Sequence, residues 1–236
     1  MANSLLVFLH GFGEDVRMWD DFVPHFSWPF DYTCPNYADW TDCDSISAYA
    51  RKIVHELPKD SSLILIGHSM GGYIALAIAE LFPARVARVV LLHSTPSADS
   101  EEKKSARDKT VAFLQSHGVR SFLGPFVSNL FAAEFAKRNP NLMRELSSRY
   151  ADLPAEALMA ATVAMKQRPA CWDFLGKTGI PFLFILGDQD ALIPHDSILR
   201  GLEGKGQHKC VILPSVGHQG TYESPNACFE AMAAFL

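Results

Sequence analysis

A serine at position 69 lies in a pattern that makes a hydroxyl nucleophilic. Residues 67–71 form a G-x-S-x-G motif, with an apolar run at 63–66 before it and strong helix formers at 73–80 after it. A sharp turn from strand to helix lifts such a serine out of the packed layers, beside backbone N–H groups that stabilise an oxyanion. We therefore expect a nucleophile elbow at Ser69.

An acid and a histidine that would complete the site also follow strand-like runs. Asp190 comes after the apolar run at 181–187, and His218 comes after the run at 209–214. In an open parallel sheet, reactive groups gather beyond the carboxyl ends of the strands. We expect Asp190 to fix the tautomer of His218 and to stabilise its imidazolium form, while His218 takes the serine proton.

Other acids and histidines have competing interpretations. Asp188 and Asp99 are alternative acids, although a loop aspartate often only caps a turn. His10 is expected to brace the backbone after the first strand, and His68 to point away from Ser69. His93 either lines the pocket or packs in the core. Surface or hydrogen-bonded structural positions are expected for the rest: His25, His55, His117, His195 and His208.

Strand-like runs alternate with helical patterns along most of the chain. The runs cover residues 5–10, 32–37, 63–68, 86–93, 181–187 and 209–214, and helices are expected at 19–26, 46–57, 70–82, 197–202 and 226–236. This alternation favours an α/β fold, with a mostly parallel sheet of about six strands flanked by helices. Residues 97–176 have helical spacing without a convincing strand. We expect an α/β core at 1–96 and 177–236, with a helical cap inserted at 97–176.

Composition narrows the class of protein. A chain of 236 residues with 48% hydrophobic content suits one catalytic domain with an insertion. Its net charge of -5 gives no case for binding nucleic acid, which would favour a basic face. The N-terminal residues show neither a signal peptide nor a membrane span. Reduced thiols are expected for the scattered cysteines, Cys34, Cys43, Cys171, Cys210 and Cys228, and the expected location is cytoplasmic.

Together these motifs resemble the α/β-hydrolase fold superfamily, in particular its Ser-His-Asp esterase-like group with a helical cap. The matching residues are His10-Gly11-Phe12-Gly13, Met18-Trp19, the 67–72 elbow, Gly187-x-x-Asp190-x-x-x-Pro194 and Gly217-His218. The resemblance covers almost the whole chain. It implies a triad of Ser69, Asp190 and His218, with the backbone N–H groups of Phe12 and Met70 as oxyanion donors.

The chain also departs from that family pattern in two places. Its first strand corresponds to the family's third, so the two usual N-terminal strands are expected to be missing. The Gly-x-Gly turn that usually follows the second of the predicted strands is replaced by residues 36–42, which contain no glycine. Neither departure affects the residues of the implied triad.

The expected substrate pocket lies under the cap. Phe126 and Met159 of the insertion, together with Phe12 and His93, are predicted to contact the substrate. Residues 97–176 carry 11 Lys and Arg against 9 Asp and Glu, a net +2, whereas the rest carries 10 against 17, a net -7. A relatively basic cap favours an anionic substrate or an acidic acyl carrier.

These features predict a serine hydrolase that cleaves a carboxylic ester of a small or medium acyl chain through an acyl-enzyme. Two alternatives stay open: a C–C bond hydrolase or lyase that uses the same triad, and a ligand-binding receptor with slow turnover. No cofactor or metal is expected. The glycine pattern at 11–16 has Val16 where a dinucleotide loop has its third glycine, and no Cys/His cluster has metal-ligand spacing.

Overall fold

Six parallel strands form the centre of the protein in the computed structural model, which describes residues 4–204 and 207–236. They run in the order β2-β1-β3-β4-β5-β6, and every neighbouring pair is parallel. Their bounds are β1 (Ser4–Leu9), β2 (Asp31–Thr33), β3 (Ser62–His68), β4 (Val86–Leu92), β5 (Phe182–Gly187) and β6 (Lys209–Leu213). The predicted parallel sheet is therefore confirmed.

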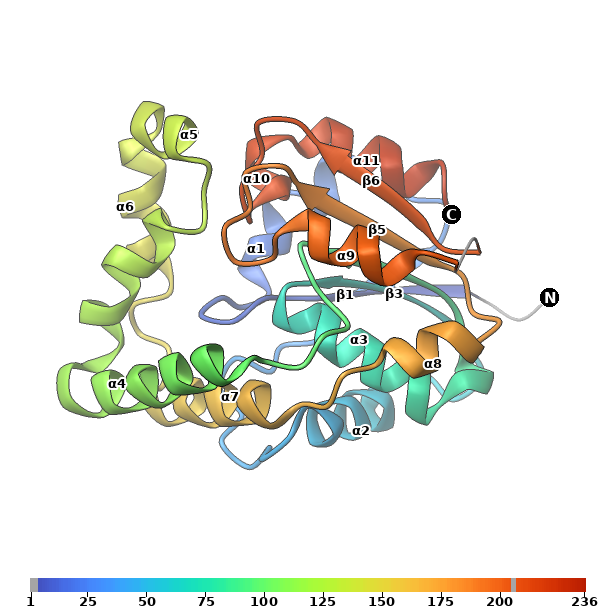
Figure 1. The fold of residues 1–236 in the computed structure, drawn as a ribbon, viewed down its shortest axis with the longest axis horizontal. Helices are drawn as coiled ribbons and strands as arrows, with labels where there is room; N and C mark the ends of the chain where they lie inside the picture. The colour runs from blue at the N-terminus through green and yellow to red at the C-terminus, as the bar shows by residue number, and fades with distance from the viewer. Residues whose placement is uncertain (1–3, 205–206) are drawn as a thin grey trace.

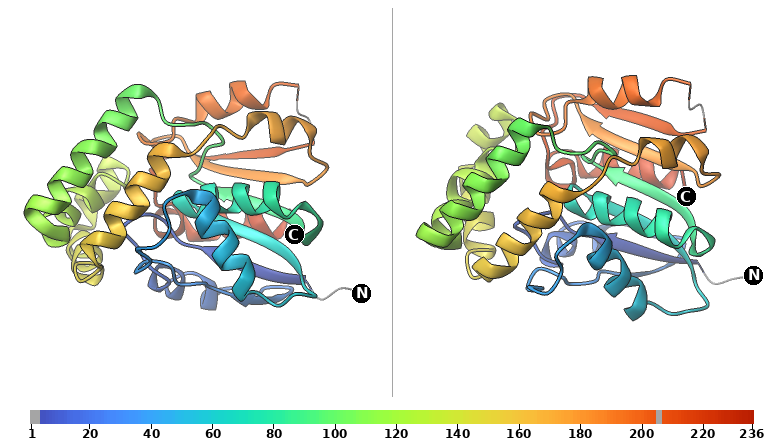
Figure 2. Two further views of the ribbon diagram at one scale, coloured as in Figure 1. Left: turned by 90° about the horizontal axis from the view of Figure 1, so that it is seen from below. Right: turned by 60° about the horizontal axis from the view of Figure 1, so that its bottom comes forward.

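Helices cover both faces of the sheet (Figures 1 and 2). In β1, Val7 and Leu9 join one buried cluster while Leu6 and Phe8 join the other, as the two-residue period of a strand requires. The first cluster is completed by α2 (Ile46–Glu56), α3 (Met70–Leu81), α8 (Trp172–Lys177) and α9 (His195–Leu202). The second is completed by α1 (Arg17–Asp20) and α11 (Pro225–Ala233). Short helical turns fill three connections: η1 (Val23–His25), η2 (Pro83–Arg85) and α10 (Gly220–Glu223).

Two predicted elements are shorter than expected, and a proline accounts for each. The helix predicted at 19–26 divides into α1 and η1, because Pro24 has no N–H to continue an α-helical ladder. The strand predicted at 32–37 ends at Thr33, since Pro35 cannot donate a hydrogen bond to a neighbouring strand. The two corrections concern β2, at the edge of the sheet, and the segment that precedes it.

The inserted helices lie at the end of the sheet to which the strands point (Figure 1). They are α4 (Glu101–Ser128), α5 (Ala133–Arg138), α6 (Pro140–Arg149) and α7 (Ala155–Gln167), here called the cap. α4 breaks at Gly118, whose φ of 74° lies in the region that glycine favours. The predicted insertion also contains α8, which packs on the core instead, with Phe174 edge-on to Phe182 of β5.

All five cysteines are free thiols, so the expectation of reduced cysteines agrees with the structure. Within the described ranges, no helix combines the length and apolar character that crossing a bilayer requires.

Candidate active site

Ser69 occupies a strained turn between β3 and α3. Its φ of 50° and ψ of -112° are unusual for a residue with a side chain and cost on the order of 1–3 kcal/mol. A Cβ at Gly67 would lie 2.4 Å from the Gly71 carbonyl oxygen, and a Cβ at Gly71 would lie 2.2 Å from the Leu9 carbonyl oxygen. Only glycine fits at these two positions, which explains the G-x-S-x-G spacing. The turn is further held by the Ser94 hydroxyl, which donates to the Ser69 carbonyl at 2.8 Å.

The three predicted reactive residues meet in one hydrogen-bonded chain. His218 Nδ1 lies 2.7 Å from Asp190 Oδ2, and His218 Nε2 lies 2.9 Å from Ser69 Oγ. Because the carboxylate can only accept, Nδ1 carries the proton and Nε2 accepts from the serine hydroxyl. Asp190 Oδ1 accepts from the backbone N–H groups of Leu192 and Ile193, both at 2.9 Å. An arrangement of this kind can activate a hydroxyl for nucleophilic attack.

Asp190 is held as a carboxylate. Burial acts to raise the pKa of this carboxyl group, but the charge and hydrogen bond of His218, together with His93, outweigh that effect. The pKa therefore lies well below its usual value. The alternative acids are placed elsewhere: Asp188 is exposed, and Asp99 forms ion pairs with Arg107 at 3.1 Å and with Arg168 at 3.0 Å.

His93 packs behind Asp190 and does not line the pocket, so its predicted contact with substrate is wrong. Its side chain is fully buried, with Nδ1 3.4 Å from Asp190 Oδ2. Burial lowers the pKa of His93 to about 4, which favours the neutral ring. His93, Asp190 and His218 also place possible metal-ligand atoms within 4.8 Å of one another. However, His218 Nδ1 needs its proton for the bond to Asp190, so the triad geometry and metal ligation by this nitrogen exclude each other.

The loop after β1 is braced as the sequence predicts. The His10 ring stacks on Tyr37 with centroids 3.7 Å apart, and its Nδ1 bonds the Gly11 carbonyl at 2.9 Å. Phe12 on this loop lines the pocket, whereas Met70 begins α3. The Met70 N–H is thus one of the first-turn donors that have no acceptor within their own helix. Both residues predicted to supply oxyanion donors, Phe12 and Met70, are therefore close to Ser69 in the structure: Phe12 lines the same pocket, and Met70 directly follows Ser69.

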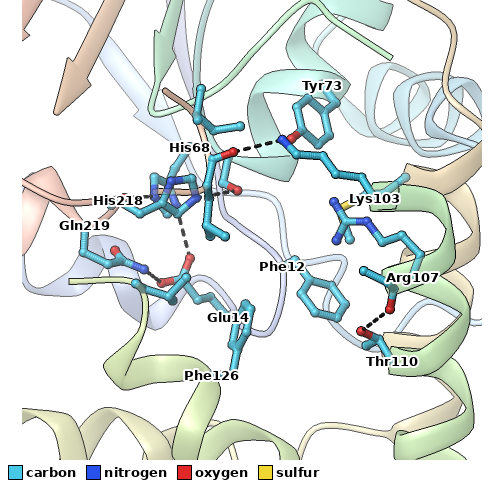
Figure 3. A pocket seen from close by; sticks show the side chains of 16 residues that line it. Phe12, Glu14, His68, Tyr73, Lys103, Arg107, Thr110, Phe126, His218 and Gln219 are labelled. Carbon is cyan, nitrogen blue, oxygen red and sulfur yellow. Dashed lines mark hydrogen bonds and ion pairs between the residues drawn. The ribbon is translucent and has the colours of Figure 1, made fainter. Parts of the chain in front are cut away.

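A pocket of about 190 Å³ opens beside Ser69 and His218 (Figure 3). Phe126 lines it, so its contact with substrate stays a prediction. Met159 does not: it borders a separate hollow with Asp42 and Cys43, and its predicted contact with substrate is therefore wrong. The apolar part of the lining includes Phe12, Phe126, Leu130, Met165, Leu192 and Ile193.

Residues 6–231 match the model of the alpha/beta hydrolase family. This range covers nearly the whole chain and contains Ser69, Asp190 and His218. The chain belongs to the alpha/beta hydrolase family. This result confirms the resemblance, the fold class and the expectation of a hydrolase-type enzyme.

Individual relatives agree with this assignment. The chain is 25% identical to a pimeloyl-[acyl-carrier protein] methyl ester esterase of Yersinia enterocolitica, covering 98% of this chain and 92% of that protein. It is 31% identical to a biotin biosynthesis bifunctional protein of Teredinibacter turnerae, over 99% of this chain but only 45% of that longer protein. A thermophilic esterase from Thermogutta terrifontis has the same fold, with a TM-score of 0.88, 24% identity, and coverage of 99% and 89% of the two chains.

This hydrolase contains a buried charged pair next to the triad that sequence reasoning missed. His68 Nε2 lies 2.9 Å from the His218 carbonyl oxygen, and His68 Nδ1 lies 3.2 Å from Glu14 Oε2 (Figure 3). Gln219 donates to the other Glu14 oxygen at 2.6 Å. The carbonyl can only accept, so Nε2 is protonated. Burial acts to lower the pKa of His68, but the charge and hydrogen bond of Glu14 outweigh it and raise that pKa, which favours an imidazolium beside the Glu14 carboxylate.

The expectation that His68 points away from the site is therefore corrected. His68 lines the pocket, and its ring centroid is 5.3 Å from that of His218. It holds the backbone of the loop that carries the histidine. A polar side chain at the end of an apolar strand was the one available signal of this role.

Glu223 fixes the same loop from the other side. Its carboxylate accepts from the backbone N–H groups of Gly217 at 3.0 Å, Gln219 at 3.2 Å and Ala132 at 2.9 Å. Ala132 lies in the connection between α4 and α5, and the His218 N–H donates to the carbonyl of Leu130 in the same connection at 2.7 Å. The histidine loop of the hydrolase is thus attached directly to the segment that follows α4.

Proposed function

We propose that this protein is a serine ester hydrolase that cleaves a carboxylic ester of a small or medium acyl chain through an acyl-enzyme. The observation that carries the proposal is the continuous chain from Asp190 through His218 to Ser69, which ends at the pocket. Such a chain supplies both a nucleophile and the base that activates it.

In the proposed reaction, Ser69 Oγ attacks the ester carbonyl carbon while its proton passes to His218 Nε2. The negative charge that develops on the carbonyl oxygen is stabilised by the backbone N–H groups of Phe12 and Met70. His218 then protonates the departing alcohol, and the acyl group stays on Ser69. A water molecule loses a proton to His218 and attacks the acyl carbon, which releases the acid and restores the serine hydroxyl.

The relatives and the pocket support an ester as the substrate. The relative from Yersinia enterocolitica is named for hydrolysis of a methyl ester on a carrier-bound acyl chain. The pocket here has an apolar stretch that includes Phe12, Phe126 and Leu130 between its polar groups, which suits a short acyl chain. A basic cap is compatible with an anionic or carrier-bound substrate.

Reaction with a fluorophosphonate probe and hydrolysis of short p-nitrophenyl esters test the proposal together. We expect one covalent adduct per chain, located at Ser69 by peptide mass spectrometry. Ser69→Ala should remove the adduct and lower kcat by on the order of 10³- to 10⁶-fold without unfolding the protein.

Other results would point to the alternatives. Labelling at Ser69 without ester turnover would favour C–C bond chemistry on the same triad. Slow labelling with a single turnover would favour a receptor. No labelling of the folded protein would contradict the mechanism.

A further inference from the structure

Positive side chains gather on one wall of the pocket. Lys103 and Arg107 lie one turn apart on α4, and both line the cavity together with Thr110. Figure 3 shows these three residues on the side opposite His218 and Glu14, with Phe12 and Phe126 between the two sides. The pocket therefore has a reactive side, an apolar middle and a basic wall.

The basic wall has more positive than negative charge. Arg107 and the neighbouring Arg168 share a single carboxylate, Asp99, at 3.1 and 3.0 Å. The Arg168 guanidinium also lies 3.8 Å from the centroid of the ring of Tyr73, a residue that lines the pocket. Two guanidinium groups against one carboxylate leave a net positive charge behind this wall.

Lys103 adds a second positive charge at the wall itself. Its Nζ donates to the Leu192 carbonyl at 3.0 Å, and among the residues that the structure describes no carboxylate lies within ion-pair distance of it. An ammonium group has three donors, so further donors are available for a ligand. Burial lowers the pKa of Lys103, as expected for a cation with reduced access to water.

The carboxylates on the reactive side already have hydrogen-bond or ion-pair partners. Glu14 pairs with the His68 imidazolium at 3.2 Å. Asp190 accepts hydrogen bonds from His218 and from two backbone N–H groups. An anion that entered the pocket would therefore find its complementary charge at the basic wall.

We propose that the wall formed by Lys103 and Arg107 is a subsite for an anionic oxygen group of the substrate. The preferred substrates are then esters whose acyl chain ends in a carboxylate or phosphate, with the methylene chain against Phe12 and Phe126. This inference rests on the proposed ester hydrolase function and adds the substrate class. An ion pair in a partly dehydrated pocket gives selectivity that an apolar wall alone does not provide.

The test compares the methyl half-esters of succinic, adipic and suberic acid with methyl esters of neutral monocarboxylic acids of equal chain length. A methyl ester whose acyl chain ends in a phosphate forms a third arm, which shows whether the subsite prefers a carboxylate or a phosphate. We expect a higher kcat/KM for anionic esters at one chain length, and a preference that weakens as salt is added. Lys103→Met should lower the ratio of anionic to neutral kcat/KM by about three- to tenfold, the range of a partly exposed ion pair. Lys103→Glu should lower it further.

Lys104→Met is the matched control, because Lys104 is the next residue on α4 but pairs with Glu101 at 2.8 Å and does not line the pocket. It should leave the ratio unchanged. Fluorophosphonate labelling of Ser69 in each variant checks that the reactive side is intact. Hydrolysis of neutral esters with no anionic preference, or a ratio that Lys103→Met does not change, would overturn the subsite and leave the ester hydrolase function standing. Absence of both turnover and labelling would instead reject the function itself.

Discussion

At the scale of single residues, Asp190 has two histidine neighbours but only one of them reaches the serine. His218 Nδ1 is 2.7 Å from its carboxylate, whereas His93 Nδ1 is 3.4 Å away. Asp190→Asn keeps the shape but offers an amide that favours the wrong tautomer of His218. We expect kcat to fall by roughly 10⁴-fold, as it does for the equivalent change in serine proteases.

The matched change is Asp99→Asn, because Asp99 is also a buried acid but pairs with Arg107 of the basic wall and with Arg168 behind it. Steady-state hydrolysis of a neutral p-nitrophenyl ester should show a much smaller loss for this variant. If Asp99→Asn lowers kcat more than Asp190→Asn does, the assignment of the acid is incorrect.

The Glu14–His68 pair is expected to position His218. His68→Gln leaves the Glu14 carboxylate buried without its cation, which should destabilise the fold by about 3 kcal/mol or more. It should also lower kcat by on the order of 100-fold, since a displaced catalytic group costs that much. Urea unfolding and steady-state kinetics measure the two effects separately.

The double variant Glu14→Gln/His68→Gln separates positioning from stability, because it removes both charges. We expect the free energy of unfolding to recover in part while kcat stays low. A recovery of kcat together with stability would show that the pair has only a structural role.

The meeting of Ser69, Asp190 and His218 was predictable from sequence because each directly follows a strand, and parallel strands bring their carboxyl ends together. The supporting residues were not. His68 meets Glu14 from 54 positions away and the His218 carbonyl from 150 positions away, while Gln219 meets Glu14 across 205 positions. Such contacts depend on loop geometry that no local pattern encodes. His93 shows that a strand-end position can also mislead. That position predicted a place in the pocket, but the ring of His93 is buried in the core.

At the scale of elements, the cap separates into residues that face the pocket and residues that do not. Phe126 lines the cavity from the second half of α4, after the break at Gly118. Met159 of α7 borders a different hollow near Asp42. Helical periodicity alone could not distinguish them, because both are apolar residues of cap helices and only the packing of those helices decides which of them reaches the cavity.

This difference gives a paired prediction on chain-length preference. Phe126→Ala enlarges the pocket and should shift the relative kcat/KM across a series of ester chain lengths by about 1–3 kcal/mol, the range for a methylene or two in an apolar pocket. Met159→Ala should leave the profile in place. A flat response to Phe126→Ala would move the control of chain length away from the cap and onto the loops of the sheet, such as the one that carries Phe12.

At the scale of the whole molecule, both faces of the parallel sheet are buried, so titratable groups at its carboxyl edge are enclosed between the sheet, the loops and the cap. Burial lowers the pKa of both His10 and His93 to about 4, from an ordinary value of 6.5. Their rings are neutral in the folded protein, while in the unfolded chain they take up protons below pH 6.5. The folded state therefore loses stability as the pH falls from about 6.5 to about 4.

Each of these histidines should contribute a slope of about 1.4 kcal/mol per pH unit to the free energy of unfolding within that window. His10→Asn removes one of them and should reduce the slope by that amount, as measured by urea unfolding at a series of pH values from 7.5 to 4.5. The loss of stacking on Tyr37 lowers stability equally at every pH, so it changes the offset of the curve at pH 7.5 and not its slope. An unchanged slope would mean that His10 takes up its proton over the same pH range in the folded and the unfolded protein. Once protonated, its ring could no longer accept the Tyr37 N–H, and the bracing of the loop that carries Phe12 would need another explanation.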